Sequence, residues 1–197
     1  NGEGMNGAVF QMFNHGLSSA MMFLVVGVIY DRAHHREIER FGGLGLQMPR
    51  YLTLSIIAFF ASLGLPGLSG FVSEIMVFLG AFRSNSTAAF PQAWQWVLSM
   101  KVLTIIGSLG VVLGAAYLLY TIQRVYLGPS KPEYAGFPDL KWNEYASLVP
   151  LGALAIVLGI LPGLALNIFA PAMNSMLSLW AGGGKVVASQ VGGALGL

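Results

Sequence analysis

The sequence predicts an all-α membrane protein with about four transmembrane helices, of which the second is discontinuous. Only 9% of the 197 residues are charged and 55% are hydrophobic, whereas about 25% of residues are charged in ordinary soluble domains. Ten basic and eight acidic side chains are too few to cover a soluble protein of this length, so the expected surroundings are lipid. The second observation is a set of four long apolar stretches.

Each apolar stretch has the length of a membrane span, because about 20 mainly apolar residues cross a hydrocarbon core about 30 Å thick. Backbone groups in lipid must form hydrogen bonds within their own segment, so the stretches are expected to be helices. The expected spans lie at about residues 7–30, 51–83, 99–123 and 145–170 of a helical region 1–173, and a tail rich in small residues follows over 174–197.

The first span contains no charged side chain apart from His15, when that residue carries a proton. If the helix begins at the outer surface near Gly7, His15 lies about 12 Å below that surface. Taken alone, such a histidine is more often a packing residue than a proton carrier.

The second span is expected to be broken near residues 64–70, which include Gly64, Pro66, Gly67 and Gly70. Proline removes a backbone donor and clashes with the preceding turn, and glycine lowers helix propensity. The stretch is also too long for one straight crossing. Transporters place ion sites at such breaks. Glu74, which follows the break, therefore favours two half-helices over the alternative, a proline kink in one helix.

Glu74 follows the break inside an otherwise apolar helix. A charged side chain at the centre of a bilayer costs at least about 2.5 kcal/mol, so acids at this depth are usually functional. Measured from Arg83 as the outer boundary, Glu74 lies about 13 Å deep, which matches the depth of His15. We therefore expect the two groups to form a proton-relay layer, with both side chains facing the interior of the helix bundle.

The third span offers weaker candidates. Lys101 lies at its outer end, where its side chain either extends to water or serves the exit of a proton path. Gly110 and Gly114 have the spacing of a close-packed helix contact. Several polar side chains in the spans have two interpretations, as the lining of a hydrated path or as helix-to-helix contacts: Asn14, Ser18, Ser19, Ser69, Ser73, Thr104, Ser108 and Tyr117.

The loops predict the orientation of the chain. Seven of the ten basic residues lie in the two loops 31–50 and 124–143, and three lie elsewhere. Positive residues collect on the cytoplasmic side of membrane proteins, so these two loops are expected in the cytoplasm, or in the matrix of an organelle.

Several function classes are excluded by composition. A net charge of +2 without a dense basic run gives no reason to expect nucleic acid. The absence of cysteine excludes disulfides, thiolate metal sites and cysteine nucleophiles. The sequence has no phosphate-binding loop, dinucleotide fingerprint or metal-ligand motif, so no cofactor is expected in this chain. Because the chain begins with Asn1, we expect it to be part of a longer polypeptide.

Three stretches carry a family resemblance: Asn14-His15-Gly16-Leu17-Ser18, Tyr30-Asp31-Arg32-Ala33-His34, and Leu65-Pro66-Gly67 followed by Gly70-Phe71-Val72-Ser73-Glu74. In this order and spacing they resemble the antiporter-like membrane subunits of proton-pumping NADH:quinone oxidoreductase, or complex I, and chain M (subunit 4) in particular. The resemblance covers about residues 3–170. It implies that the chain forms the last four helices of a larger antiporter-like bundle.

The resemblance also implies a function. Family members carry a histidine at the position of His15, and on the broken helix they carry a glutamate or, in sister subunits, a lysine at the position of Glu74. The chain would contribute the exit half of a proton channel, driven by quinone reduction in other subunits. The implied partners are neighbouring complex I membrane subunits and lipid, and the implied location is a bacterial inner membrane, or a thylakoid or mitochondrial inner membrane.

Alternative functions remain open at this point. A subunit of a multi-subunit Na⁺/H⁺ antiporter would share the broken helix, although lysine rather than glutamate at position 74 would favour it. A subunit of a membrane-bound hydrogenase is also compatible with glutamate at position 74. A purely structural membrane protein is disfavoured by Glu74 and His15.

Overall fold

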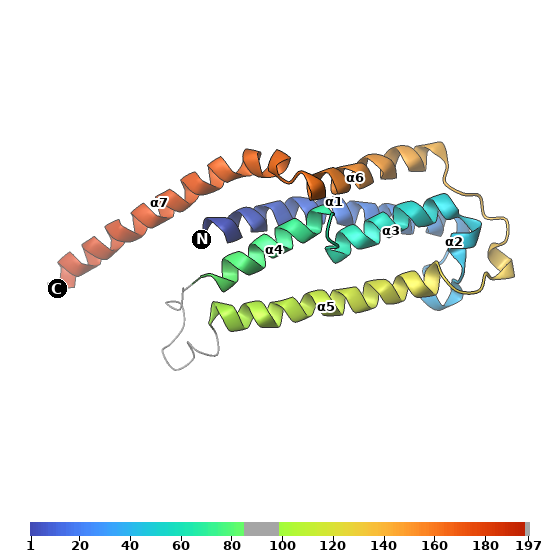
Figure 1. Ribbon diagram of the computed structural model, residues 1–197, viewed down its shortest axis with the longest axis horizontal. Coiled ribbons are helices and arrows are strands. Elements are labelled where there is room, and N and C mark those ends of the chain that lie inside the picture. The colour runs from blue at the N-terminus through green and yellow to red at the C-terminus, as the bar shows by residue number, and fades with distance from the viewer. Residues whose placement is uncertain (85–98, 196–197) are drawn as a thin grey trace.

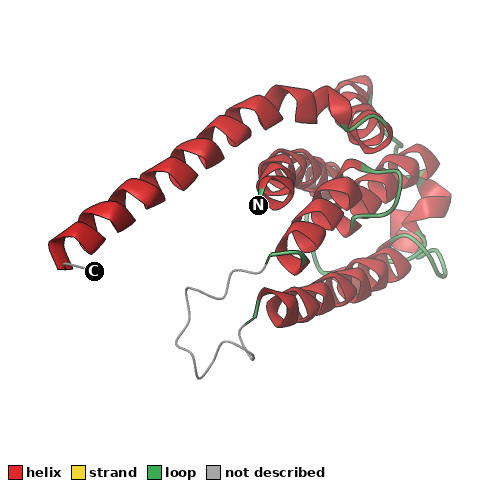
Figure 2. Ribbon diagram, turned by 60° about the vertical axis from the view of Figure 1, so that its left-hand side comes forward, coloured by secondary structure: helices red, strands yellow, loops and turns green. Residues whose placement is uncertain are grey.

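The computed structural model describes residues 1–84 and 99–195, with side chains described as far as residue 179. Within these ranges the chain is helical and contains no strand (Figures 1 and 2). The long helices are α1 (Gly2–Ala33), α3 (Pro49–Leu63), α4 (Ser69–Phe82), α5 (Met100–Val125), α6 (Trp142–Ile160) and α7 (Gly163–Leu195). The short elements are η1 (Ile38–Arg40), α2 (Leu44–Gln47) and η3 (Pro132–Tyr134).

The predicted all-α membrane fold is confirmed. Helices α1, α5 and α6 are long and apolar enough to cross a membrane. The two shorter apolar helices α3 and α4 together occupy the place of the second expected span, which is therefore discontinuous, as predicted. These four spans run side by side along the long axis of the molecule (Figure 1).

Helix α1 is the centre of the bundle, because α3, α4, α6 and α7 all pack against it. The main apolar core lies where α1, α3, α5 and α6 approach the basic loops, and it includes the fully buried side chains of Met21, Tyr51 and Leu148. Helix α5 joins this core through Leu118, Ile122 and Val125 only, and most of its remaining surface is exposed. The bundle is therefore tight around α1 and open along α5.

The two basic loops lie together at one end of the bundle, which agrees with their assignment to one side of the membrane. Lys131, in the loop after α5, donates hydrogen bonds to the backbone carbonyls of Glu39 and Arg40 in the loop after α1. Nearby, Arg32 at the end of α1 forms a paired salt bridge with Glu144 in the first turn of α6, at 2.8 and 2.9 Å. This salt bridge ties the first span to the last.

The last expected span differs from the structure. Residues 145–170 were expected to form one helix, but α6 ends at Ile160 and α7 begins at Gly163. Pro162 accounts for the break, because proline disfavours a helical conformation at the preceding residue, and Leu161 has a φ of −122° and a ψ of 62°. The segment expected as a tail continues as helix to Leu195 and projects away from the bundle (Figure 2).

Candidate functional site

The break in the second span is made by a left-handed turn at Gly64. Gly64 follows the last residue of α3 with a φ of 71°, and the backbone N–H of Leu65 donates to the carbonyl of Phe60. The chain then passes Pro66 and Gly67, which has a φ of 94°, and α4 begins at Ser69. Of the residues predicted to break the helix, Gly64, Pro66 and Gly67 therefore lie in the break, whereas Gly70 lies in the first turn of α4.

Gly64 also leaves room for the carboxyl of Glu74. A Cβ atom built on Gly64 would lie 2.5 Å from Oε2 of Glu74, so the carboxyl occupies the space that a side chain at position 64 would need. Glu74 is ten positions further along the sequence, but the loop between the two half-helices places the start of α4, and with it Glu74, beside the end of α3. The carboxyl of Glu74 accepts no hydrogen bond and forms no ion pair within the described residues.

Glu74 opens onto a cavity of about 310 Å³ between the broken span and α5. Gly107, Gly110, Gly114 and Tyr117 line the α5 side of the cavity. Gly110 and Gly114 do not form the expected close helix contact within the described part of the chain, because none of its atoms lies within 4 Å of a Cβ built on either residue. Here the absence of side chains creates space in front of the carboxyl instead of allowing helices to touch.

His15 does not join this cavity. Its side chain is exposed on α1, and the only hydrogen-bond partner described for its ring is the hydroxyl of Ser19, 3.4 Å from Nε2. The expectation that both titratable groups face the interior of the bundle is therefore wrong for His15. The reason is helix geometry. Asn14 points towards α4, and the next residue lies about 100° further around the helix, whereas Glu74 faces α5.

A buried polar cluster joins α1 to the first turn of α4. The Nδ2 atom of Asn14 donates to the carbonyl of Ser69 at 2.9 Å and to Oγ of Ser73 at 3.0 Å. Ser73 in turn donates to Oε1 of Gln11. Of the two interpretations of these side chains, helix contact is the correct one for Asn14, Ser69 and Ser73. Gln11 was not expected here, although its position one turn before Asn14 places it on the same helix face.

The remaining polar candidates differ in whether they line the cavity of Glu74 or form hydrogen bonds within their own helices. Tyr117 lines the cavity of Glu74. The hydroxyls of Ser18, Thr104 and Ser108 donate to backbone carbonyls of their own helices. Lys101 is exposed in the first turn of α5, and its ammonium lies 5.8 Å from the ring centroid of Phe82. Lys101 is thus not among the residues that line the cavity of Glu74.

These features define a class: a multi-pass integral membrane protein with an acidic side chain beside the break in a discontinuous helix. The comparisons with known proteins give the family. Residues 1–99 match the model of the NADH:quinone oxidoreductase/Mrp antiporter transmembrane family, and the chain belongs to this family.

Individual relatives agree with this assignment. The chain is 38% identical to NADH-quinone oxidoreductase subunit M of Rickettsia felis over 175 residues, which is 88% of this chain and 32% of that protein. It is 38% identical to subunit M of Rhodobacter capsulatus over 178 residues, 90% of this chain and 32% of that protein. Respiratory complex I from Thermus thermophilus contains a chain that matches with a TM-score of 0.71 and 29% identity, covering 89% of this chain and 34% of that one. The chain thus spans about a third of the length of these relatives.

Proposed function

We propose that this chain is part of a proton-translocating membrane subunit of an NADH:quinone oxidoreductase, located in a bacterial inner membrane. The observation that carries the proposal is Glu74 itself, a carboxyl without a hydrogen-bond partner in the described chain that faces a cavity at a helix break. The family and the relatives named subunit M support the assignment to an oxidoreductase. Neighbouring membrane subunits are the proposed partners.

The cavity is large enough for the proposed role. Each water molecule occupies about 30 Å³ in the liquid, so 310 Å³ holds several. A water molecule can bridge two polar groups almost as well as a direct hydrogen bond does. In this proposal, a hydrogen-bonded chain of water molecules in the cavity carries a proton to and from Glu74. In this proposal Glu74 alternates between the charged and the neutral form, and the redox reaction takes place in other subunits, without a cofactor in this chain.

His15 and Lys101 have supporting roles in the proposal. His15 is a second proton carrier, and because it is exposed on α1, its path lies outside the cavity of Glu74. Lys101 lies at the exit side of the third span. Antiport, of the sodium–proton type that the sequence left open, is the second candidate function, since the family description includes an antiporter. The oxidoreductase names of the relatives and the glutamate at position 74 favour the first.

NADH-driven proton uptake by inverted membrane vesicles tests the proposed function. We expect NADH to acidify the vesicle interior when the full-length protein is present. When the gene of the protein is deleted, we expect NADH to cause no acidification. An imposed sodium gradient without NADH is expected to move no protons. Proton movement that follows the sodium gradient and does not respond to NADH would establish the antiporter and refute the proposal.

A further inference from the structure

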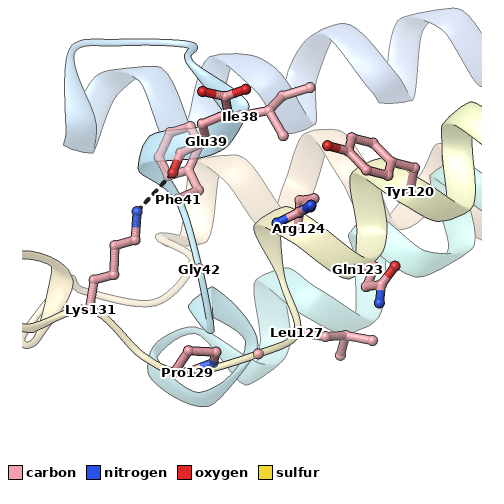
Figure 3. Close-up of a pocket in the computed structure, with 11 residues that line it drawn as sticks. Ile38, Glu39, Phe41, Gly42, Tyr120, Gln123, Arg124, Leu127, Pro129 and Lys131 are labelled. Carbon is pink, nitrogen blue, oxygen red and sulfur yellow. Dashed lines mark hydrogen bonds between the residues drawn. The ribbon is translucent and has the colours of Figure 1, made fainter.

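A second cavity, of about 750 Å³, lies between η1 and the loop that follows α5, at the end of the bundle where the basic loops meet (Figure 3). Two cations line it, Arg124 from the last turn of α5 and Lys131 from the loop. It is separate from the cavity of Glu74, and the proposed proton transport makes no use of it.

The donors in this cavity are largely unused. Within the described part of the chain, the side chain of Arg124 forms no ion pair and no hydrogen bond, and its guanidinium lies 5.2 Å from the ring centroid of Tyr120. Gln123, beside it, also has no side-chain partner there. Lys131 donates to two backbone carbonyls, at 2.7 and 2.8 Å, which leaves the third N–H of its ammonium unused.

One acidic side chain, Glu39, also lines the cavity. Figure 3 shows its carboxylate directed away from Arg124 and Lys131, and the bond to Lys131 is made by its backbone carbonyl. The unused groups that face the cavity are therefore cations and neutral donors. Such a set of donors fits an anion with several oxygen acceptors.

The cavity also lies where lipid headgroups are found. A helix of 26 residues such as α5 is about 39 Å long and exceeds the hydrocarbon thickness of about 30 Å, so Arg124 in its last turn reaches the polar boundary. Leu109 and Leu113 precede Tyr120 and Arg124 on the same face of α5, and both are mostly exposed. An apolar face thus runs from the basic cavity towards the bilayer centre.

We propose that this cavity binds the phosphate group of an anionic phospholipid, whose acyl chains lie along the exposed face of α5. The planar guanidinium of Arg124 binds two phosphate oxygens at once, as arginine does at phosphate sites. Lys131 adds a second positive charge, and Gln123 adds a neutral donor. Basic pockets on the cytoplasmic or matrix side of membrane proteins bind acidic headgroups in this way.

Thermal unfolding of the full-length protein in a neutral detergent, with phosphatidylglycerol titrated into the micelles, tests this proposal. We expect phosphatidylglycerol to raise the unfolding temperature, and phosphatidylcholine and sodium phosphate not to do so. In Arg124→Gln, the half-effective concentration of phosphatidylglycerol should rise roughly fivefold, the effect of one basic residue near a membrane surface. Arg50→Gln, which removes an exposed charge at the same end of the bundle, should respond as the unmodified protein does.

Each other outcome overturns the proposal. An unchanged response in Arg124→Gln would exclude the site, and an equal loss in Arg50→Gln would indicate general surface charge. An equal rise with sodium phosphate would indicate a site for a free anion without the lipid. If Arg124→Gln does not fold, Arg124→Lys decides the question. It keeps the charge but loses the paired hydrogen bonds, so its response should weaken, and an unweakened response contradicts the proposal.

Discussion

Gly64 lies beside the carboxyl of Glu74 because it has no side chain, and its positive φ allows α3 to end there. Gly67 provides a matched comparison, since its φ of 94° is also positive but no atom of the described residues lies within 4 Å of a Cβ built on it. The two glycines therefore separate backbone strain from displacement of Glu74.

Gly64→Ala and Gly67→Ala should each lower the stability of the protein by about 1–2 kcal/mol, the cost of a left-handed conformation for a residue with a Cβ. Only Gly64→Ala should also impair proton pumping, because its methyl group displaces the flexible end of Glu74. Thermal unfolding in detergent and proton uptake by vesicles measure the two effects. Equal loss of pumping in both variants would show that the break alone matters, and not the contact with Glu74.

Among the elements, α1 and α6 are joined by the salt bridge between Arg32 and Glu144, whose side chains are 6% and 11% exposed. Arg83 and Glu3 form a salt bridge at the opposite end with side chains that are 63% and 35% exposed. Removal of one partner from a buried pair leaves an uncompensated charge, whereas water screens an exposed pair.

Arg32→Gln is therefore expected to destabilise the protein by about 3 kcal/mol, and Arg83→Gln by less than about 1 kcal/mol. The midpoint of thermal unfolding in detergent, measured for both variants under the same conditions, checks this difference. Similar losses in the two variants would mean that the link between the first and last spans is not held by this salt bridge.

For the molecule as a whole, the sequence was sufficient to predict the membrane class, the first three spans and the broken helix. Long apolar stretches and the turn at Gly64 and Pro66 are local signals that can be recognised in the sequence. Long apolar stretches in lipid form helices, because their backbone groups must form hydrogen bonds within the segment. The interruption at Pro162 was missed because the apolar stretch continues across it. A proline just past a helix end and a proline inside a helix look alike in sequence, as Pro171 within α7 shows.

The candidate site was less predictable, because it depends on the rotation of helices about their own axes. Counting residues gave similar depths for His15 and Glu74 but not the directions in which they point, and the structure places them on different faces of the bundle. The same limit applies to Gly110 and Gly114, whose spacing does not reveal whether another helix lies against them. Long-range pairs such as Arg32 with Glu144 leave no local signal at all.

Replacement of Glu74 by glutamine in the full-length protein tests the central claim most directly. Glutamine keeps the size of the side chain but carries no exchangeable acidic proton. Proton uptake per NADH oxidised is measured in inverted vesicles, with Glu133→Gln, which removes an exposed acid in the loop after α5, as the control. A native gel verifies that the protein complex is assembled.

The account predicts that Glu74→Gln lowers proton uptake by about tenfold or more, since general acid–base groups contribute at least about 100-fold to proton transfer, while assembly and the Glu133→Gln control stay normal. Full proton uptake by an assembled Glu74→Gln protein would contradict the account.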